Sequence, residues 1–254
     1  DEGLAQRRRR GPHHRGAAAR QHRAVLGRHL ALDRVDEALA AFDEVAASAP
    51  DFADVHYNRG NALYDLGRLG EALSSYQRAI ELRPGHAQAW YNRGKALADL
   101  RRRDEALASY DRAVAIRPTF AEAWSNRGVA LADMGRMDEA LASYDRAIAE
   151  GPWYAPAYSN RGNVLKKLYR LDEALADYTR ASTLKPGYSD ALYAAAQILR
   201  DSKQTDEAIA RIETLMRYDP DYGAGALVDL KRTACDWNGI EALTAQCIAE
   251  TREG

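Results

Sequence analysis

The sequence repeats itself with a period of 34 residues. Six prolines mark this period along most of the chain: Pro50, Pro84, Pro118, Pro152, Pro186 and Pro220. An acid–alanine pair keeps the same spacing, at Glu37-Ala38, Glu71-Ala72, Glu105-Ala106, Glu139-Ala140, Glu173-Ala174, Glu207-Ala208 and Glu241-Ala242. An aromatic residue follows at Phe42, Tyr76, Tyr110, Tyr144 and Tyr178, with Ile212 in the next copy. A fixed period of this length predicts a solenoid, in which small units are stable only when stacked on their neighbours.

Residues 87–120 illustrate one unit. Ala, Arg and Leu are frequent in it, which favours helix, and Gly94 would let a neighbouring helix approach closely. The stretch 101–104 is expected to form a turn, and Asp104 suits the positive start of a second helix. Pro118 cannot continue that helix. The repeated tyrosines are interpreted as core residues of the second helices and not as a platform for stacking nucleic-acid bases.

The spacing of one set of residues resembles the tetratricopeptide-repeat (TPR) pattern: Trp90, Gly94, Ala106, Tyr110, Ala113 and Pro118. The resemblance implies an all-α fold, a right-handed superhelical TPR solenoid of antiparallel helix pairs. Residues 19–222 are expected to form six repeats, the first of them degenerate. Residues 223–254 would be an incomplete seventh pair, or a junction to a missing domain, with Gly223 and Gly225 loosening its first helix. Residues 1–18 form an Arg-rich leader, which we expect to be disordered.

One position of the first helix holds an asparagine in four successive copies: Asn58, Asn92, Asn126 and Asn160. Asparagine is several tenths of a kcal/mol worse than alanine in a helix, so its repeated use needs a reason. The segments 57–63 and 157–165 resemble the TPR domain of O-linked N-acetylglucosamine transferases, especially the bacterial SPINDLY-like proteins. That resemblance implies that the asparagines line the concave surface and grip the backbone of an extended peptide. Replacing Asn92 and Asn126 by alanine is then expected to weaken peptide capture and to leave thermal stability nearly unchanged.

Further candidate contacts flank these asparagines: Tyr57, Tyr91, Tyr193, Asn61, Lys95 and Asn163. An aspartate recurs at the end of the first helix, at Asp65, Asp99, Asp133 and Asp201. The resemblance implies an acidic rung that selects basic or hydroxyl side chains, and a solvated helix end is the alternative. A recurring arginine, at Arg59, Arg93, Arg127 and Arg161, is expected to pack between helices and to find an acid such as Asp111 or Asp145.

These patterns favour a protein-interaction scaffold that binds an extended peptide segment. A second hypothesis is a substrate-recruiting arm of a protein O-glycosyltransferase whose catalytic domain lies outside these residues, because the segment 229–243 resembles the junction after the repeats of SPINDLY-like proteins. A third is self-assembly through an exposed apolar end formed by Leu227, Val228, Leu230, Ile240 and Leu243. The carboxylate clamp of heat-shock co-chaperones is incomplete here, since Tyr or Ser precedes the asparagines and only Lys95 adds a cation.

Composition disfavours several other classes. The net charge of −1 offers no overall basic surface for nucleic acid, although eight arginines lie within residues 1–28. Cys235 and Cys247 lack CxxC spacing, which favours a reducing, cytoplasmic compartment. No apolar run is long enough to span a membrane. No catalytic motif or metal-ligand spacing occurs, so we expect no enzyme activity, no metal and no cofactor in this chain.

Overall fold

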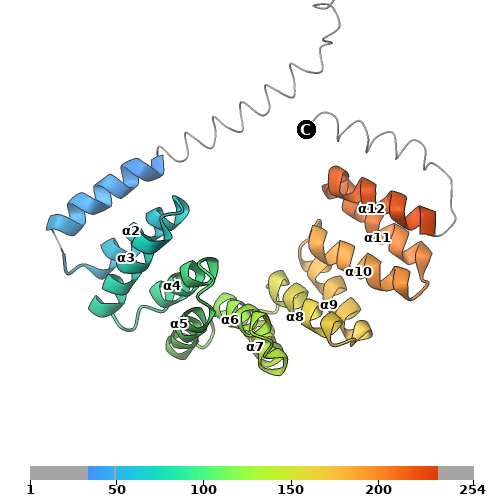
Figure 1. The fold of residues 1–254 in the computed structure, drawn as a ribbon, viewed down its shortest axis with the longest axis horizontal. Coiled ribbons are helices and arrows are strands. Elements are labelled where there is room, and N and C mark those ends of the chain that lie inside the picture. The colour runs from blue at the N-terminus through green and yellow to red at the C-terminus, as the bar shows by residue number, and fades with distance from the viewer. Residues whose placement is uncertain (1–33, 49, 234–254) are drawn as a thin grey trace, which may run out of the picture. The chain divides into compact units, whose positions relative to one another are not determined.

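The computed structural model describes residues 34–48 and 50–233. All of these residues lie in helices or in the turns between them, and the described ranges contain no strand. The described residues fall into two compact units, one within Asp1–Leu100 and the other within Arg101–Gly254. The first unit contains a helix at 34–48 followed by α2 (Ala53–Asp65), α3 (Leu69–Leu82) and α4 (Ala87–Asp99) (Figure 1). The second contains α5 (Arg103–Ile116), α6 (Ala121–Asp133), α7 (Met137–Glu150), α8 (Ala155–Lys167), α9 (Leu171–Leu184), α10 (Ser189–Asp201), α11 (Thr205–Tyr218) and α12 (Pro220–Thr233).

The helices form pairs that follow the period of the sequence. In each unit a first helix packs against the second helix of its own pair, as α2 does with α3 and α6 with α7. First helices also contact the first helix of the next pair, as α2 does with α4 and α6 with α8. The expectation of an all-helical chain built from helix pairs is therefore confirmed. Side chains of successive first helices can meet, although they stand one period apart in the sequence.

The core of three pairs, α2–α3, α6–α7 and α8–α9, depends on a glycine facing a tyrosine ring. A Cβ atom added to Gly60 would lie 2.6 Å from the Tyr76 ring, and one added to Gly128 would lie 2.6 Å from the Tyr144 ring. Such distances are too short for two carbon atoms, so only glycine allows the ring to sit there. Both tyrosines are 1% exposed. This confirms that the repeated tyrosines are packing residues and that the glycine permits a close approach.

The turn inside each pair places one residue in the left-handed region of the backbone. Two copies use glycine there, Gly67 at φ 72° and Gly135 at φ 78°. The other three use Arg101, Tyr169 and Lys203, with φ between 58° and 62°. This geometry ends a helix sharply, and it costs about 1–2 kcal/mol for a residue that carries a Cβ.

Aromatic side chains of the first helices hold the loop that precedes each helix. The Trp90 Nε1 donates to the Pro84 carbonyl at 3.0 Å, and the Trp124 Nε1 donates to the Pro118 carbonyl at 2.8 Å. The periodic proline therefore ends one helix and accepts a hydrogen bond from the next.

The C-terminal part of the described chain differs from the sequence-based expectation. α12 begins at Pro220 and runs without a break through both of its glycines, so the expectation of a loosened helix is wrong. Gly223 is buried, and a Cβ there would collide with Met216. Leu227 and Leu230 are each 4% exposed and pack into the core formed with α10 and α11, so they are not part of an exposed apolar end. Ile240, Leu243 and the leader 1–18 lie outside the described residues.

Candidate functional site

A polar cavity of about 260 Å³ lies between α2, α3 and α4 in the first unit. Six side chains line it: Asn61, Tyr64, Asp65, Tyr76, Asn92 and Lys95. Four of them, Asn61, Asp65, Asn92 and Lys95, are residues that the sequence singled out as candidates for peptide contact. Five of the six come from the first helices α2 and α4, and Tyr76 reaches in from α3. The repeat thus brings polar groups of two successive copies to one place.

The side chains of Asn61 and Asn92 are hydrogen-bonded to each other in this cavity. The Asn92 Nδ2 donates to the Asn61 Oδ1 at 2.8 Å and also lies 3.3 Å from the Tyr57 hydroxyl. The Tyr76 hydroxyl donates to the same Asn61 Oδ1 at 3.0 Å. Neutral hydrogen bonds of this kind contribute about 0.5–1.5 kcal/mol each to stability. Asn92 therefore also joins two repeats, so the expectation that its loss leaves stability nearly unchanged no longer holds.

Charged and aromatic groups form the other wall of the cavity. The Lys95 Nζ lies 4.6 Å from the centre of the Tyr64 ring, within the range of a cation–π interaction. The Tyr64 hydroxyl donates to the Asp99 Oδ2 at 2.6 Å. Burial, followed by the hydrogen bond to Asp99, raises the pKa of Tyr64 well above its ordinary value, so the phenol stays protonated. Asp65 and Lys95 both line the cavity, so it holds one carboxylate and one ammonium group.

The remaining candidate residues lie elsewhere on the first helices. Asn58 is exposed on α2, and Tyr91 and Asn126 are half-buried on α4 and α6. The Asn160 Nδ2 lies 3.4 Å from the Ser125 Oγ, which repeats in α6 and α8 the relation of Asn92 to Tyr57.

Two candidates on the first helices of the second unit are already engaged. Asn163 accepts a hydrogen bond from the Tyr178 hydroxyl at 2.7 Å, as Asn61 does from Tyr76. Asp133 lies 3.9 Å from the Arg103 Nε, a loose ion pair.

The sequence did not single out Tyr64, or the hydroxyl of Tyr76, as part of this site. A buried tyrosine hydroxyl needs a hydrogen-bond partner, and asparagine stands fifteen residues before the core tyrosine in the copies that contain Asn61 and Asn163. This spacing of fifteen residues can be read from the sequence, so the hydrogen bond of the Tyr76 hydroxyl could have been predicted. The contact of Tyr64 with Asp99 spans two repeats and required the structure.

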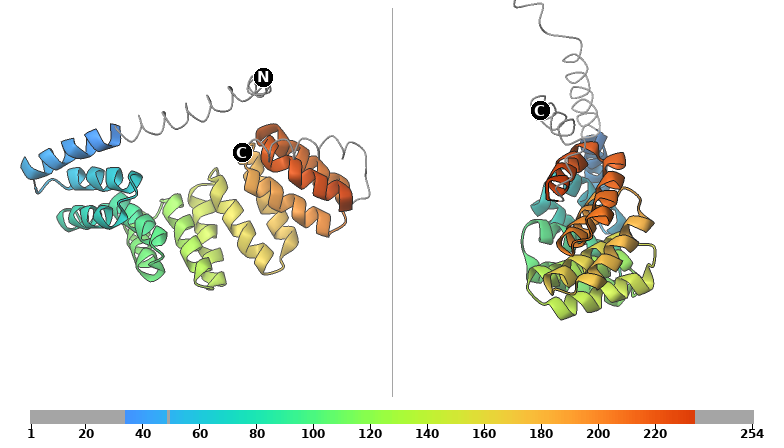
Figure 2. Two further views of the ribbon diagram at one scale, coloured as in Figure 1. Left: turned by 45° about the horizontal axis from the view of Figure 1, so that its top comes forward. Right: turned by 90° about the vertical axis from the view of Figure 1, so that its right-hand side faces the viewer.

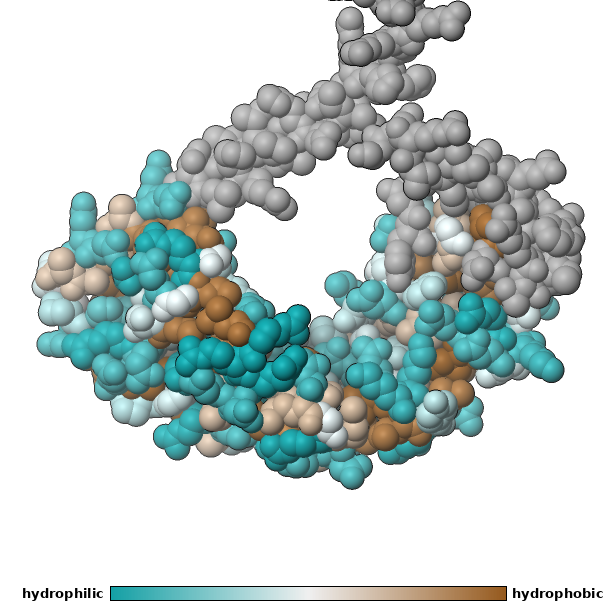
Figure 3. Space-filling model, viewed as in Figure 1, coloured by the Kyte–Doolittle hydropathy of each residue, from teal (hydrophilic) through white to brown (hydrophobic). Residues whose placement is uncertain are grey.

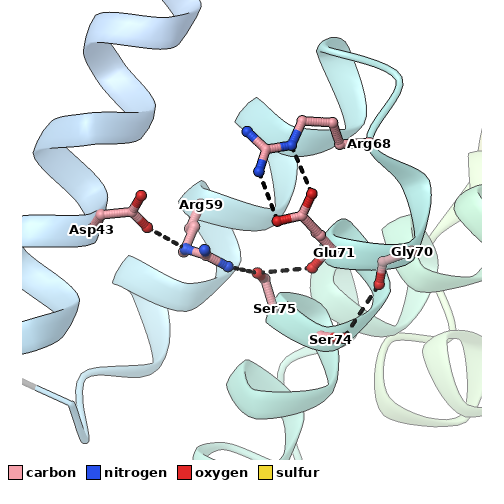
Figure 4. A network of polar contacts seen from close by, with 7 residues as sticks. All are labelled: Asp43, Arg59, Arg68, Gly70, Glu71, Ser74 and Ser75. Atoms are coloured by element: carbon pink, nitrogen blue, oxygen red, sulfur yellow. Dashed lines mark hydrogen bonds and ion pairs between the residues drawn. The ribbon is translucent and has the colours of Figure 1, made fainter.

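The recurring arginines connect successive second helices. The Arg59 Nε donates to Asp43 at 2.5 Å and its Nη1 donates to the Ser75 Oγ at 2.7 Å (Figure 4). Arg127 bonds Asp111 and Ser143 in the same way, and Arg161 bonds Asp145 and Asp177. Each arginine thus bridges a residue sixteen positions before it and one sixteen positions after it. The expectation that they pair with acids such as Asp111 and Asp145 is confirmed.

Two further features bear on what the chain can do. Within residues 34–48 and 50–233, no group of three or more His, Cys, Asp or Glu side chains could hold a metal ion. Among the helices that the structure describes, none is long and apolar enough to cross a membrane.

Comparison with protein-family models decides the family. One model described as tetratricopeptide repeat matches residues 28–87, 59–119 and 91–155, and a second with the same description matches residues 165–228. The chain belongs to the tetratricopeptide-repeat family. No curated protein matches it. The TPR models cover residues 28–155 and 165–228, so most of the chain consists of TPR repeats.

Solved structures of similar fold support this assignment. A TPR protein named YrrB, described as having an unusual peptide-binding site, is 23% identical with a TM-score of 0.57, over 73% of this chain and 97% of that one. PilW, described as a widely conserved type IV pilus biogenesis factor, is 20% identical with a TM-score of 0.68, over 80% and 94%. MamA is 24% identical with a TM-score of 0.58, over 63% and 94%. At these identities the likeness shows the TPR solenoid fold alone.

Proposed function

We propose that this chain is an interaction scaffold that binds an extended segment of a partner protein along its first helices. The observation that carries the proposal is the polar cavity in which Asn61 and Asn92 meet between α2 and α4. An amide side chain offers a donor and an acceptor together, which matches a peptide group without depending on its side chain. YrrB, a TPR protein described as having a peptide-binding site, supports the same use of this fold.

The hydrogen bonds of Asn92 indicate how a peptide would be held. The Asn92 amide hydrogens are directed at Asn61 and Tyr57, which leaves its carbonyl oxygen to accept a peptide N–H. Asn58, which is exposed on α2, offers both its amide hydrogens and its carbonyl oxygen. We extend the same role to Asn126 and Asn160, with Tyr57, Tyr91, Asn61, Lys95, Asn163, Asp65, Asp99 and Asp133 as flanking contacts.

The energetics limit what these asparagines contribute. At about 0.5–1.5 kcal/mol per hydrogen bond, four to eight bonds supply about 2–12 kcal/mol, much of which offsets the freedom that the two partners lose on association. Millimolar affinity already requires about 4 kcal/mol, so the asparagines fix the register of the segment and other side chains must supply the rest.

The test compares Asn92→Ala with a control of similar stability loss outside the cavity. Trp124→Phe is such a control, because it removes the hydrogen bond to the Pro118 carbonyl in the second unit. A random peptide library is selected on the wild-type chain, and the affinities of the selected peptides for both variants are measured by fluorescence polarisation. We expect Asn92→Ala to weaken binding about tenfold and Trp124→Phe to leave it within about twofold. Equal losses in both variants would contradict the proposal.

A second candidate function is the substrate-recruiting arm of a nucleotide-sugar-dependent protein O-glycosyltransferase. It is favoured by the sequence segments 57–63, 157–165 and 229–243, which resemble SPINDLY-like proteins. The two candidates share the peptide-binding surface, and only the transferase requires a catalytic domain encoded beyond Gly254. Reading the parent open reading frame past that codon separates them, since a stop codon soon after it would exclude the transferase.

A further inference from the structure

A second cavity, of about 210 Å³, lies between α10, α11 and α12 in the second unit. Figure 2 shows these three helices side by side, and both α10 and α11 contact α12. The lining residues are Tyr193, Ala196, Gln197, Arg200, Ile212, Gly225, Ala226 and Leu230. Five of these eight are apolar or glycine, in contrast to the polar cavity of the first unit.

The two cavities occupy the same place in the repeat. Tyr193, Gln197, Arg200 and Ile212 stand four periods after Tyr57, Asn61, Tyr64 and Tyr76 respectively. Between α2 and α4 that place holds a tyrosine hydroxyl and two asparagine amides. Between α10 and α12 the core tyrosine is replaced by Ile212 and Asn92 by Val228, so the hydroxyl and one of the amides are gone.

The change from polar to apolar follows from a paired substitution in the core. Gly60, Gly128 and Gly162 each leave room for a tyrosine ring, and an added Cβ would lie 2.6–2.9 Å from it. The corresponding position in α10 is Ala196, which excludes such a ring, and the shorter Ile212 faces it instead. Ile212 is completely buried, and it lines the cavity without filling it.

The size and charge of this cavity indicate its occupant. A dry protein cavity of about 150 Å³ is large enough to bind benzene, so this one accommodates an aromatic ring. Arg200 at its edge is paired with Asp201 at 3.0 Å, and the Gln197 Oε1 accepts a hydrogen bond from the Lys166 Nζ at 2.7 Å. Because the arginine charge is balanced by that carboxylate, an uncharged side chain is favoured over an acidic or basic one.

We propose that this cavity is a specificity pocket that accepts one aromatic or large aliphatic side chain of the bound protein segment. The inference rests on the proposed function, because Tyr193 and Gln197 occupy the same repeat positions as Tyr57 and Asn61 of the first unit. The asparagines bind the peptide backbone and do not distinguish one peptide sequence from another. The pocket would make that distinction by burying one apolar side chain of the peptide. The segment recognised is therefore an extended one with a single large apolar anchor.

The test restores in the sixth repeat the core pair that the other copies use. In the double variant Ala196→Gly/Ile212→Tyr, the ring takes the place it has against Gly162, and its hydroxyl can donate to Gln197 as Tyr178 does to Asn163. The cavity should then take on the polar character of the one between α2 and α4, where the core pair is Gly60 and Tyr76, without loss of the fold. Gly162→Ala/Tyr178→Ile, the reverse exchange in the fifth repeat, is the matched control that leaves the pocket lining intact.

Two measurements are made on the full chain. Indole is titrated while the methyl resonances of Ile212 and Leu230 are recorded by NMR, and a random twelve-residue peptide library is selected on the wild type and on both variants. We expect indole to shift both methyl groups in the wild type and in the control, and to leave Leu230 unshifted in the Ala196→Gly/Ile212→Tyr variant. We expect selected peptides to carry a Phe, Trp, Tyr or Leu whose replacement by Ala weakens wild-type binding about tenfold or more. The Ala196→Gly/Ile212→Tyr variant should lose the same factor, because its tyrosine hydroxyl makes the cavity polar.

The outcomes separate the pocket from the proposed function. Peptides that bind the wild type and the Ala196→Gly/Ile212→Tyr variant equally well would overturn the pocket and leave the scaffold function standing. Indole binding with no peptide enriched on any form would overturn the scaffold function and, with it, the anchor role of the pocket. Nuclear Overhauser contacts from Ile240 or Leu243 to Ile212 would show that the chain itself occupies the cavity, which would also overturn the proposal.

Discussion

At the scale of single residues, a glycine in the first helices α2, α6 and α8 sets how closely the two helices of a pair approach. Gly128 faces the Tyr144 ring so closely that any side chain would overlap with it. In the sixth repeat the equivalent pair is Ala196 and Ile212, a larger residue facing a smaller one. Both solutions fill a similar space, because cores tolerate exchanges that conserve total volume far better than single enlargements.

Gly128→Ala separates helix propensity from packing. Propensity alone would make the variant about 1 kcal/mol more stable, whereas overpacking against Tyr144 costs about 1–3 kcal/mol. We expect a net loss of up to about 2 kcal/mol by urea denaturation. Gly128→Ala/Tyr144→Ile should recover part of that loss, since it reproduces the pair of the sixth repeat. A single variant that is more stable than the wild type would refute the packing argument.

A buried charge appears at one other position of the repeat. This position holds a serine in three copies, at Ser75, Ser109 and Ser143. In the fifth copy it holds Asp177, whose side chain is 5% exposed. Arg161 pairs with both oxygens of Asp177, at 2.7 and 2.8 Å, and this hydrogen bonding holds the pKa of Arg161 above its ordinary value. The arginine is thus committed to stabilising the fold and is not available to a partner.

Arg161→Ala is expected to destabilise the chain by about 3 kcal/mol, because it leaves the Asp177 carboxylate buried without its counter-charge. Arg161→Ala/Asp177→Ser should be closer to the wild type, since serine carries no charge to compensate. The free energies of unfolding of the two single variants and the double variant form a mutant cycle. Additive losses would contradict a direct coupling between the two side chains.

At the scale of one helix, the start of α4 depends on a neutral histidine. The Nδ1 of His86 accepts a hydrogen bond from the Ala89 backbone N–H at 3.2 Å, so that nitrogen must be unprotonated. Burial lowers the pKa of His86, and repulsion from Arg83 acts in the same direction. The Nε2 lies 3.4 Å from the Asp54 carboxylate, which opposes the shift without reversing it.

This histidine predicts a pH dependence of stability. Since the folded-state pKa lies below the ordinary value of about 6.5, the unfolded chain takes up more protons as the pH falls below that value. The contribution of His86 is therefore complete above about pH 6.5 and decreases at lower pH. His86→Asn keeps a capping side chain that does not titrate, so its free energy of unfolding should fall less between pH 7.5 and pH 5. Parallel pH profiles for both proteins would exclude His86 as the cause.

At the scale of the whole molecule, each helix contacts mainly helices of its own pair and of the adjacent pairs within the units. In the view of Figure 3 the surface of the described residues is mainly hydrophilic, with smaller apolar patches. Stability is therefore expected to be close to a sum of repeat and neighbour contributions.

Removing one complete period tests this additivity. Deleting residues 121–154 joins Phe120 to Ala155, so that Phe120 replaces Tyr154 and Asp111 replaces Asp145 as the partner of Arg161. We expect unchanged helicity per residue by circular dichroism and a lower unfolding midpoint. Deleting residues 121–137 alone removes one helix and exposes the apolar face of its neighbours, so it should lose helicity or aggregate. Loss of helicity in both deletions would contradict the modular description.

Much of the fold followed from the sequence because the period repeats the same local requirements. Pro118 ends a helix, Gly128 leaves room for an aromatic ring, and Tyr144 fills that room. Each effect follows from the residue type at that position of the repeat. The pairing of Arg127 with Asp111 was also predictable, because an arginine and an acid sixteen residues before it recur at fixed positions in successive repeats. The continuous α12 was not predicted, because the burial of Gly223 against Met216 depends on a neighbouring helix and not on local propensity.

The sequence by itself therefore determined the helix pairs and the core positions. Only the tertiary structure decided that Asn92 bonds Asn61 across two repeats, that Tyr64 reaches Asp99, and that the same place becomes an apolar cavity beside Ile212. The physical reason is that helix formation and burial follow from periodic local patterns. Hydrogen-bond partners and cavity volumes instead depend on the distances between side chains more than thirty residues apart, which a period of 34 residues brings together without revealing their geometry.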